Sequence, residues 1–247
     1  FMANSRNVKR RIWRTYRRKS RVVYPPVAID SFAHRPSEDY FLMVSEMVSY
    51  KRLDYAIREF TRNGRKLKVV GGGPEFASLK RLAGPNIEFC GRVRDDQLRE
   101  LYSRSTAFLM PGEEDFGITM VESLASGKPV IGLKRGGAAE IVTEGCGILY
   151  PEQTDESLNE ALQTFDRVSQ SLEPMHMQQR ARVFSEAAFE RRFRATLARF
   201  SVPMGDAETE HPAADDSLLR LSNFLTDDRL ATLQPADAAN LPEVTMT

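Results

Sequence analysis

The sequence is short of cysteine, histidine and tryptophan, and it has no long hydrophobic run. Its 247 residues include two cysteines, three histidines and one tryptophan. Cys90 and Cys146 are too few and too far apart to indicate a disulfide framework, so we expect buried free thiols in a reducing compartment. The histidines, His34, His176 and His211, are scattered and form no set of metal ligands. Because no apolar stretch could cross a bilayer and the start lacks a secretory core, we expect a cytoplasmic protein.

Acidic residues are absent from the start of the chain, and basic residues are scarce at its end. The net charge of +1 hides this asymmetry. The basic residues that precede the first acid, Asp30, are Arg6, Lys9, Arg10, Arg11, Arg14, Arg17, Arg18, Lys19 and Arg21. Residues 202–247 are acidic, rich in Ala and Pro, and poor in aromatic residues. We expect this tail to be disordered, apart from one short amphipathic helix over Leu218–Leu225.

Between residues 40 and 150, short apolar stretches alternate with amphipathic ones. The expected strands cover residues 40–45, 67–70, 87–90, 106–110, 129–133 and 147–150. The expected helices cover 52–62, 75–83, 95–103 and 118–126, and two more begin at Thr154 and Pro174. This alternation indicates a Rossmann-like α/β fold, in which a parallel sheet carries helices on both faces. A hydrophobic fraction of 41% is enough for such a core.

The segment Pro111–Glu122 carries the strongest functional signal. Two carboxylates, Glu114 and Glu122, stand on either side of Gly117. A helix that begins near Gly117 points the N–H groups of its first turn toward the loop that holds Glu114. The glycine also lets a ligand approach the backbone closely. Carboxylates and backbone donors at the carboxyl end of a parallel strand suit a polyhydroxylated, partly anionic ligand.

This segment resembles the Glu-x7-Glu signature of the retaining glycosyltransferases of family 4, which have the GT-B fold. Four other segments resemble motifs of the same family, in the same order: the lysine-bearing turn at 45–52, the glycine turn at 69–75, the strand and loop at 87–93, and the Gly-Gly-x-x-Glu segment at 136–142. The resemblance covers residues 22–200 and implies the carboxyl-terminal, donor-binding half of the fold.

The resemblance also implies a domain organisation. Residues 1–21 would be a remnant of the amino-terminal domain and a linker helix. Residues 22–201 would form the nucleotide-sugar-binding domain with its C-terminal helices, and residues 202–247 the acidic tail. We therefore expect the chain to be a piece of a longer enzyme, whose other half holds the acceptor site.

Three side chains take distinct roles if the resemblance holds. Glu122 would bind the ribose hydroxyls of the nucleotide, and Glu114 would hold a hydroxyl of the donor sugar close to the anomeric carbon. Lys51 would neutralise the diphosphate leaving group, assisted by Arg52. The family commonly has an arginine where this chain has Glu46, and a carboxylate there opposes diphosphate binding. Either Arg52 or Arg135 substitutes for the missing arginine, or donor binding is weaker than usual.

The backbone around the glycine corner would complete the site. The N–H groups of Phe116, Gly117 and Ile118 are expected to bind sugar hydroxyls or phosphate oxygens. Thr119 would either add a hydroxyl contact or serve as an ordinary helix cap.

Two further loops would hold the nucleotide. Gly72 and Gly73 lie in a tight turn that lacks both the P-loop and the dinucleotide spacing. We expect this turn to let the nucleotide lie over the sheet edge, and the backbone of Arg92 and Val93 to read the base. The pair Asp95–Asp96 is interpreted as a helix cap and not as a metal site.

These expectations combine into a function. The chain would transfer a hexose, with mannose favoured, from a nucleotide sugar to a glycan or lipid-linked acceptor, with retention of configuration. GDP-mannose is the preferred donor and a UDP-sugar the second, and neither a metal ion nor another cofactor is expected. The alternative is a non-catalytic module that binds a nucleotide sugar or a partner protein, because the acceptor half is absent.

The basic segment 6–21 has two interpretations. Val8, Ile12, Trp13 and Tyr16 form an apolar stripe on an otherwise basic helix. The stripe either packs on the missing domain or, with the arginines, contacts an anionic membrane surface at the inner face of the membrane. No nucleic-acid-binding module is recognisable, so nucleic acid is not an expected partner.

Overall fold

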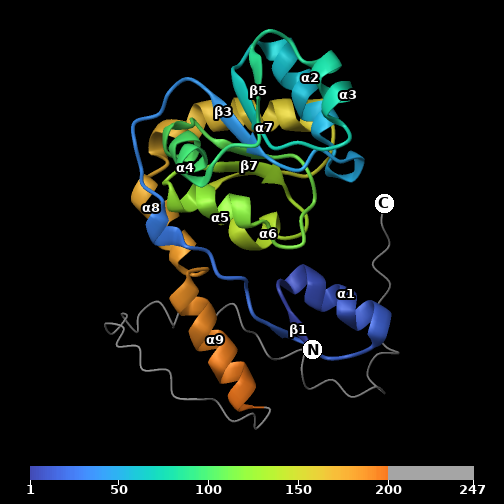
Figure 1. The fold of residues 1–247 in the computed structure, drawn as a ribbon, viewed down its shortest axis with the longest axis vertical. Helices are drawn as coiled ribbons and strands as arrows, with labels where there is room; N and C mark the ends of the chain where they lie inside the picture. The colour runs from blue at the N-terminus through green and yellow to red at the C-terminus, as the bar shows by residue number, and fades with distance from the viewer. Residues whose placement is uncertain (200–247) are drawn as a thin grey trace. The chain divides into compact units, whose positions relative to one another are not determined.

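A six-stranded parallel sheet forms the centre of the computed structural model, which describes residues 1–199 (Figure 1). Its strands are β3 (Phe41–Val44), β4 (Leu67–Val70), β5 (Ile87–Gly91), β6 (Phe108–Met110), β7 (Val130–Leu133) and β8 (Gly147–Tyr150). They lie in the order β5-β4-β3-β6-β7-β8, and every neighbouring pair is parallel. The predicted tail, with its helix over Leu218–Leu225, lies outside the described residues.

Helices cover both faces of this sheet, as predicted. The helices are α2 (Leu53–Asn63), α3 (Phe76–Leu82), α4 (Asp95–Arg104), α5 (Ile118–Ala125), α6 (Ala138–Ile141), α7 (Asp155–Val168) and α8 (Pro174–Arg182). One apolar cluster joins a face of the sheet to α2, α3 and α7, for example through Phe60 and Phe165, which both contact Phe41 edge to face. A second cluster joins the other face to α4, α5, α6 and α8.

The strand order creates a reversal point between β3 and β6. From β3 the chain builds outward through β4 and β5, and it then returns to β6 on the other side of β3. The connections that leave the carboxyl ends of β3 and β6 therefore run in opposite directions. In open α/β sheets, this is where a crevice for ligands forms. The segments that carry Lys51 and Glu114 follow these two strands.

The first residues form a short β-α-β element. β1 (Met2–Ala3) pairs in parallel with β2 (Arg21–Val22), and α1 (Arg6–Tyr16) connects them. Ser5 caps α1 by accepting a hydrogen bond from the Val8 N–H. No side chain of α1 is buried.

The last described helix is α9 (Glu186–Ala198), which Ser185 caps. Among residues 1–199, none of the helices is long and apolar enough to cross a membrane. Both cysteines are free thiols: Cys146 is buried and Cys90 is half-buried. Burial raises the pKa of the Cys90 thiol to about 11, so it is protonated at neutral pH.

Candidate active site

Lys51 and Glu114 meet where the two connections diverge. Lys51 Nζ lies 2.9 Å from Glu114 Oε1, and the two side chains are 16% and 23% exposed. Lys51 ends a short 3-10 turn, Ser49–Lys51, and Arg52 then adopts a left-handed conformation with φ of 50°. That uncommon conformation lets the chain turn sharply into α2. The structure therefore brings together the two residues for which the sequence predicted catalytic roles.

Glycines brace the loop that carries Glu114. A Cβ atom added to Gly112 would lie 2.7 Å from the Lys51 carbonyl oxygen, so the two backbones are in direct contact. From the other side, the Gly137 N–H donates to the Glu114 carbonyl over 2.7 Å. A Cβ on Gly137 would approach the Phe116 carbonyl oxygen to 1.8 Å. A Cβ on Gly136 would lie 2.1 Å from the Glu114 carbonyl oxygen. The Gly-Gly-x-x-Glu segment thus packs directly against the loop, which explains its two glycines.

The start of α5 faces the same loop without a capping side chain. Gly117 is the N-cap, with φ of 98°, and within the described part of the chain no side chain caps this helix. Phe116 is buried and stacks on Tyr24 at 5.7 Å between ring centroids, while Ile118 is exposed. Thr119 is half-buried in the first turn. A helix N-terminus without a cap presents N–H groups to an anionic or hydroxylated ligand.

Glu122 lies further along α5 and is held by a buried tyrosine. The Tyr102 hydroxyl donates to Glu122 Oε2 over 2.8 Å, and Tyr102 is fully buried. Burial raises the pKa of the half-buried Glu122 carboxyl, the Tyr102 hydrogen bond lowers it, and Asp95 raises it further. The net effect is a pKa above the ordinary value. Sequence reasoning missed Tyr102, because a tyrosine on an amphipathic helix gives no signal of its partner.

The glycine turn after β4 packs closely against the loop after β3. A Cβ on Gly71 would lie 2.0 Å from the Ser45 carbonyl oxygen, and one on Gly73 would lie 2.5 Å from the Met47 carbonyl oxygen. The Met47 N–H donates to the Gly72 carbonyl over 2.9 Å. A Cβ on Gly72 would meet no described atom within 4 Å. Gly71 and Gly73 are therefore explained by backbone packing, and Gly72 has an open side.

Other predicted site residues are not joined to the Lys51–Glu114 pair. Arg52 is exposed, and its Nε donates to Asp54 Oδ1 over 3.1 Å. Arg92 is exposed directly after β5, whereas Val93 packs against the core. Glu46 is exposed in the loop after β3.

The acidic pair at the start of α4 is displaced from its predicted position. Arg94 is the N-cap, and Asp95 and Asp96 form the first turn of the helix. Carboxylates in the first turn are favoured by the helix dipole. Residues 1–199 contain no group of three or more His, Cys, Asp or Glu side chains that could hold a metal ion.

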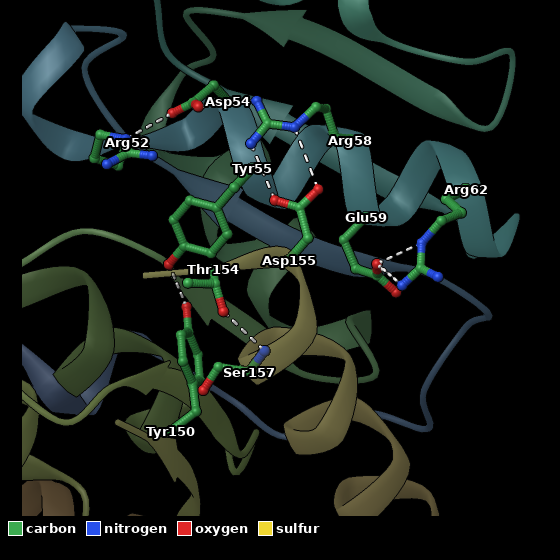
Figure 2. Close-up of polar contacts among 10 residues, drawn as sticks. All are labelled: Arg52, Asp54, Tyr55, Arg58, Glu59, Arg62, Tyr150, Thr154, Asp155 and Ser157. Carbon is green, nitrogen blue, oxygen red and sulfur yellow. Dashed lines mark hydrogen bonds and ion pairs between the residues drawn. The ribbon is translucent and has the colours of Figure 1, made fainter. Parts of the chain in front are cut away.

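Polar contacts that the sequence did not reveal tie α2 to the end of β8 and to α7 (Figure 2). Arg58 pairs with Asp54 in its own helix and with Asp155 at the start of α7, each at 3.0 Å. Below this network, the hydroxyls of Tyr55 and Tyr150 lie 2.7 Å apart. Tyr55 Oη also lies 2.7 Å from the Pro111 carbonyl oxygen.

Glu140 links the site to α1. Its carboxylate accepts hydrogen bonds from the backbone N–H groups of Arg6 and Asn7, each at 2.8 Å, and from the Tyr24 hydroxyl at 3.1 Å. Glu140 therefore binds the N-terminus of α1 from another part of the chain. A second link is an exposed ion pair of 2.6 Å between Arg11 and Asp115.

Comparison with known proteins gives a consistent result. Residues 27–183 match the family described as glycosyl transferases group 1. A D-rhamnosyltransferase of Pseudomonas aeruginosa is 29% identical over 191 residues, which cover 69% of this chain and 50% of that protein. A GDP-mannose-dependent alpha-mannosyltransferase of Corynebacterium glutamicum is 31% identical over 113 residues, or 45% of this chain and 27% of the relative. The chain thus spans half or less of the length of these relatives.

Solved structures share the fold. The Anabaena protein HepE, solved with UDP and glucose, superposes with a TM-score of 0.70 at 20% identity over 80% of this chain and 62% of its own. Sucrose-phosphate synthase from Thermosynechococcus elongatus superposes with a TM-score of 0.70 at 18% identity over 81% of this chain and 57% of its own. The family match covers more than half of the chain, and these structures share its fold. The chain therefore belongs to the group 1 glycosyl transferases, of which it contains the carboxyl-terminal half of the GT-B fold.

Proposed function

We propose that this chain binds a nucleoside diphosphate sugar at the carboxyl ends of β3 and β6 and provides the donor site of a retaining hexosyltransferase. The observation that carries this proposal is the Lys51–Glu114 pair, which places a cation and a carboxylate 2.9 Å apart beside the uncapped start of α5. A diphosphate needs the cation, and a sugar hydroxyl needs the carboxylate. The diphosphate and the sugar of a nucleotide sugar would therefore each find a partner at this one place, Lys51 for the diphosphate and Glu114 for the sugar.

Glu122 is the proposed ribose ligand. An ionised carboxylate has enough lone pairs to accept two hydroxyl hydrogens while it keeps the bond from Tyr102. The backbone of Arg92 and Val93 would contact the base, and the open side of Gly72 would leave room for the nucleotide. Phe116, Gly117 and Ile118 would bind the phosphate or the sugar through backbone N–H groups, and Thr119 would add a contact through its hydroxyl.

The proposed reaction proceeds on one face of the sugar. The bond between the anomeric carbon and the phosphate oxygen breaks, and its electron pair leaves with the diphosphate. The acceptor hydroxyl attacks from the same face and gives its proton to the departing phosphate oxygen. Lys51 stabilises the charge on the leaving group, and Glu114 holds the sugar and opposes the positive charge that develops at the anomeric carbon.

The negative charge of Glu46 would weaken diphosphate binding at this site, and a second cation would offset that charge. Arg52 is committed to Asp54 through a hydrogen bond of 3.1 Å. Arg135 is exposed after β7, next to the Gly136–Gly137 support of the loop. We favour Arg135 as the second phosphate ligand, because its side chain is not needed for an ion pair within the described residues.

GDP-mannose is the favoured donor, and a UDP-sugar is the second. The support for GDP-mannose is the similarity to the Corynebacterium glutamicum alpha-mannosyltransferase, and the support for UDP is the fold shared with HepE, which was solved with UDP and glucose. The acceptor would be a glycan or a lipid-linked sugar bound by residues outside this chain. Without them, the chain alone would bind the donor and not transfer it.

Calorimetric titration of the folded chain with GDP, GDP-mannose and UDP tests the proposal. We expect binding of GDP and stronger binding of GDP-mannose, because Glu114 adds a contact to the sugar. Tighter binding of UDP would reassign the base. No binding by any of the three at millimolar concentration, with circular dichroism showing a folded sample, would refute the donor-site proposal.

A membrane surface is a second proposed partner, supported by the exposed side of α1. Trp13 is 48% exposed and Tyr16 is 62% exposed, on a helix whose charged side chains are all basic. Aromatic and basic side chains together suit an anionic interface, which would place the enzyme at the cytoplasmic face of a membrane. Sedimentation with phosphatidylglycerol vesicles should exceed that with phosphatidylcholine vesicles, and Trp13→Ser should reduce it. Equal sedimentation with both lipids would contradict this partner.

A further inference from the structure

Two buried tyrosine hydroxyls lie next to the proposed donor site and are not among the groups proposed to bind the donor. Tyr55 belongs to the first turn of α2, and Tyr150 ends β8. Tyr55 is completely buried and Tyr150 is 2% exposed, and their hydroxyl oxygens are 2.7 Å apart (Figure 2). Buried hydroxyls of this kind cost stability unless they are bonded, so the direction of each bond matters.

The hydrogen bonds run in one direction, from Tyr150 to Tyr55 to Pro111. The Pro111 carbonyl oxygen, 2.7 Å from Tyr55 Oη, has no hydrogen to give. Tyr55 must therefore donate its only hydroxyl hydrogen to Pro111, and Tyr150 must donate to Tyr55. Burial raises the pKa of both phenols, so both keep their hydrogens at neutral pH.

Pro111 is the first residue of the loop that carries Glu114. It directly follows β6, and because proline has no N–H, its backbone is held through its carbonyl alone. Besides Tyr55, the only described donor to this carbonyl is Gln153 Nε2, at a longer distance of 3.4 Å. The next residue, Gly112, is already in contact with the Lys51 backbone. Any shift at Pro111 is therefore passed on to the Glu114 loop.

Tyr55 is also connected to the other member of the pair. It lies four residues after Lys51, directly beyond the left-handed turn at Arg52. Arg58, one helical turn further on, anchors the same part of α2 to Asp155 in α7. Tyr55 thus connects the two residues of the pair. Its backbone continues from the turn that carries Lys51, and its hydroxyl bonds Pro111 at the start of the loop that carries Glu114.

We propose that Tyr55, supported by Tyr150, is a positioning residue that sets the separation between Lys51 and Glu114 in the donor site. It touches neither donor nor acceptor and acts through Pro111. This inference rests on the proposed donor site, because its functional effect is a change in how well the site distinguishes a nucleotide sugar from the bare nucleotide. The loop itself gives a second readout that needs no ligand.

The experiment compares Tyr55→Phe and Tyr150→Phe with Tyr40→Phe. Tyr40 is a matched control, because it is also buried and donates to a backbone carbonyl, that of Leu101, over 2.8 Å. It lies immediately before β3, at the opposite end of the strand from the donor site. Tyr150→Phe and Tyr40→Phe each lose one hydrogen bond and keep the ring, whereas Tyr55→Phe also loses the bond that it accepts from Tyr150. Thermal unfolding therefore reports the general destabilisation of each variant, against which its effect on the donor site is judged.

The functional readout is the ratio of the affinities for GDP-mannose and GDP. Tyr55→Phe should reduce this ratio roughly 2- to 12-fold, the range expected for the loss of its neutral hydrogen bond to the Pro111 carbonyl. Tyr150→Phe should have a smaller effect in the same direction, because Tyr55 keeps its bond to Pro111. Tyr40→Phe should leave the ratio unchanged. A wild-type ratio in Tyr55→Phe, or an equal loss in Tyr40→Phe, would overturn the proposal.

The ligand-free readout is amide hydrogen exchange at Gly137, whose N–H donates to the Glu114 carbonyl over 2.7 Å. Tyr55→Phe should accelerate this exchange roughly 2- to 12-fold relative to Tyr40→Phe. If no nucleotide binds the wild type but this exchange accelerates, the donor site fails and the positioning of the loop stands. If nucleotide binds normally and exchange at Gly137 does not change, the positioning role fails alone.

Discussion

Removal of one buried hydroxyl, that of Tyr102, should change the pH at which the chain binds nucleotide. The Tyr102 hydroxyl donates to Glu122 Oε2 over 2.8 Å, and this bond lowers the pKa of Glu122 against the opposing effect of burial. The variant Tyr102→Phe keeps the ring in its place but deletes the donor. The pKa of Glu122, already above its ordinary value, should therefore rise further.

The size of the shift follows from the strength of the lost bond. A hydrogen bond to a charged acceptor is worth about 1.5–3 kcal/mol. Since one pKa unit corresponds to about 1.36 kcal/mol, the pKa of Glu122 should rise by about 1–2 units. Ribose hydroxyls donate to the ionised carboxylate, so nucleotide affinity should fall as the pH drops through this pKa. In Tyr102→Phe the fall should occur about 1–2 pH units higher.

The ligand-free chain should show the opposite dependence. The folded pKa of Glu122 is raised above the unfolded value, so folding favours its protonated form. Its contribution to stability is therefore fully present below the unfolded pKa and is lost as the pH rises through the folded pKa. Nucleotide affinity and this stability contribution should thus change in opposite directions over the same pH window.

Calorimetry with GDP between about pH 4.5 and about pH 8 measures the shift, with Tyr40→Phe as the control for loss of a buried tyrosine hydroxyl. The reasoning predicts a displaced midpoint for Tyr102→Phe and an unchanged midpoint for Tyr40→Phe. Weaker binding of Tyr102→Phe by the same factor at every pH, with no displacement, would refute the assignment of Glu122 as an ionised ligand.

Three further predictions concern the framework around the site. Lys128 is buried, and burial lowers its pKa to about 8, below the ordinary 10.5. The free energy of unfolding of the wild type, relative to that of Lys128→Met, should therefore rise from pH 8 toward pH 10.5. A difference in the free energy of unfolding that stays constant over this range in chemical denaturation would contradict this. Gly71→Ala should destabilise the chain by about 1–3 kcal/mol, because its Cβ would lie 2.0 Å from the Ser45 carbonyl oxygen. Gly72→Ala should not destabilise it, because a Cβ there meets no described atom within 4 Å, so equal melting temperatures of the two variants would disprove the packing argument. Glu140→Gln replaces one carboxylate oxygen by an NH2 donor, which faces the N–H groups that start α1. Hydrogen exchange of the backbone amides of α1 should therefore be faster in this variant. Unchanged exchange would exclude the anchoring role of Glu140.

The sheet and the Lys51–Glu114 pair could be predicted from the sequence for a physical reason. Apolar strands of three to five residues that alternate with amphipathic helices specify a parallel sheet almost by themselves. Lys51 and Glu114 each follow a strand, and carboxyl ends of parallel strands lie at one edge of the sheet. The family resemblance placed both residues in one donor site, whereas the neighbouring positions of β3 and β6 in the sheet come from the structure.

Contacts between side chains of different elements could not be predicted in this way. The bonds of Tyr102 to Glu122 and of Tyr55 to Pro111 depend on how helices are rotated on the sheet, which periodicity does not specify. The glycine turn shows a different limit. The sequence indicated an approach of ligand to backbone, whereas Gly71 and Gly73 are required by the neighbouring loop. A glycine pattern alone does not distinguish these two causes.

The central claim is that the two glutamates do different work in one donor site, and paired variants test it most directly. The affinities of GDP and GDP-mannose should be measured for the wild type, Glu122→Ala and Glu114→Ala. We expect Glu122→Ala to weaken both ligands alike, because both carry the ribose. Glu114→Ala should mainly abolish the preference for GDP-mannose, because its carboxylate holds the sugar. Equal losses of GDP and GDP-mannose affinity in Glu114→Ala would contradict the account.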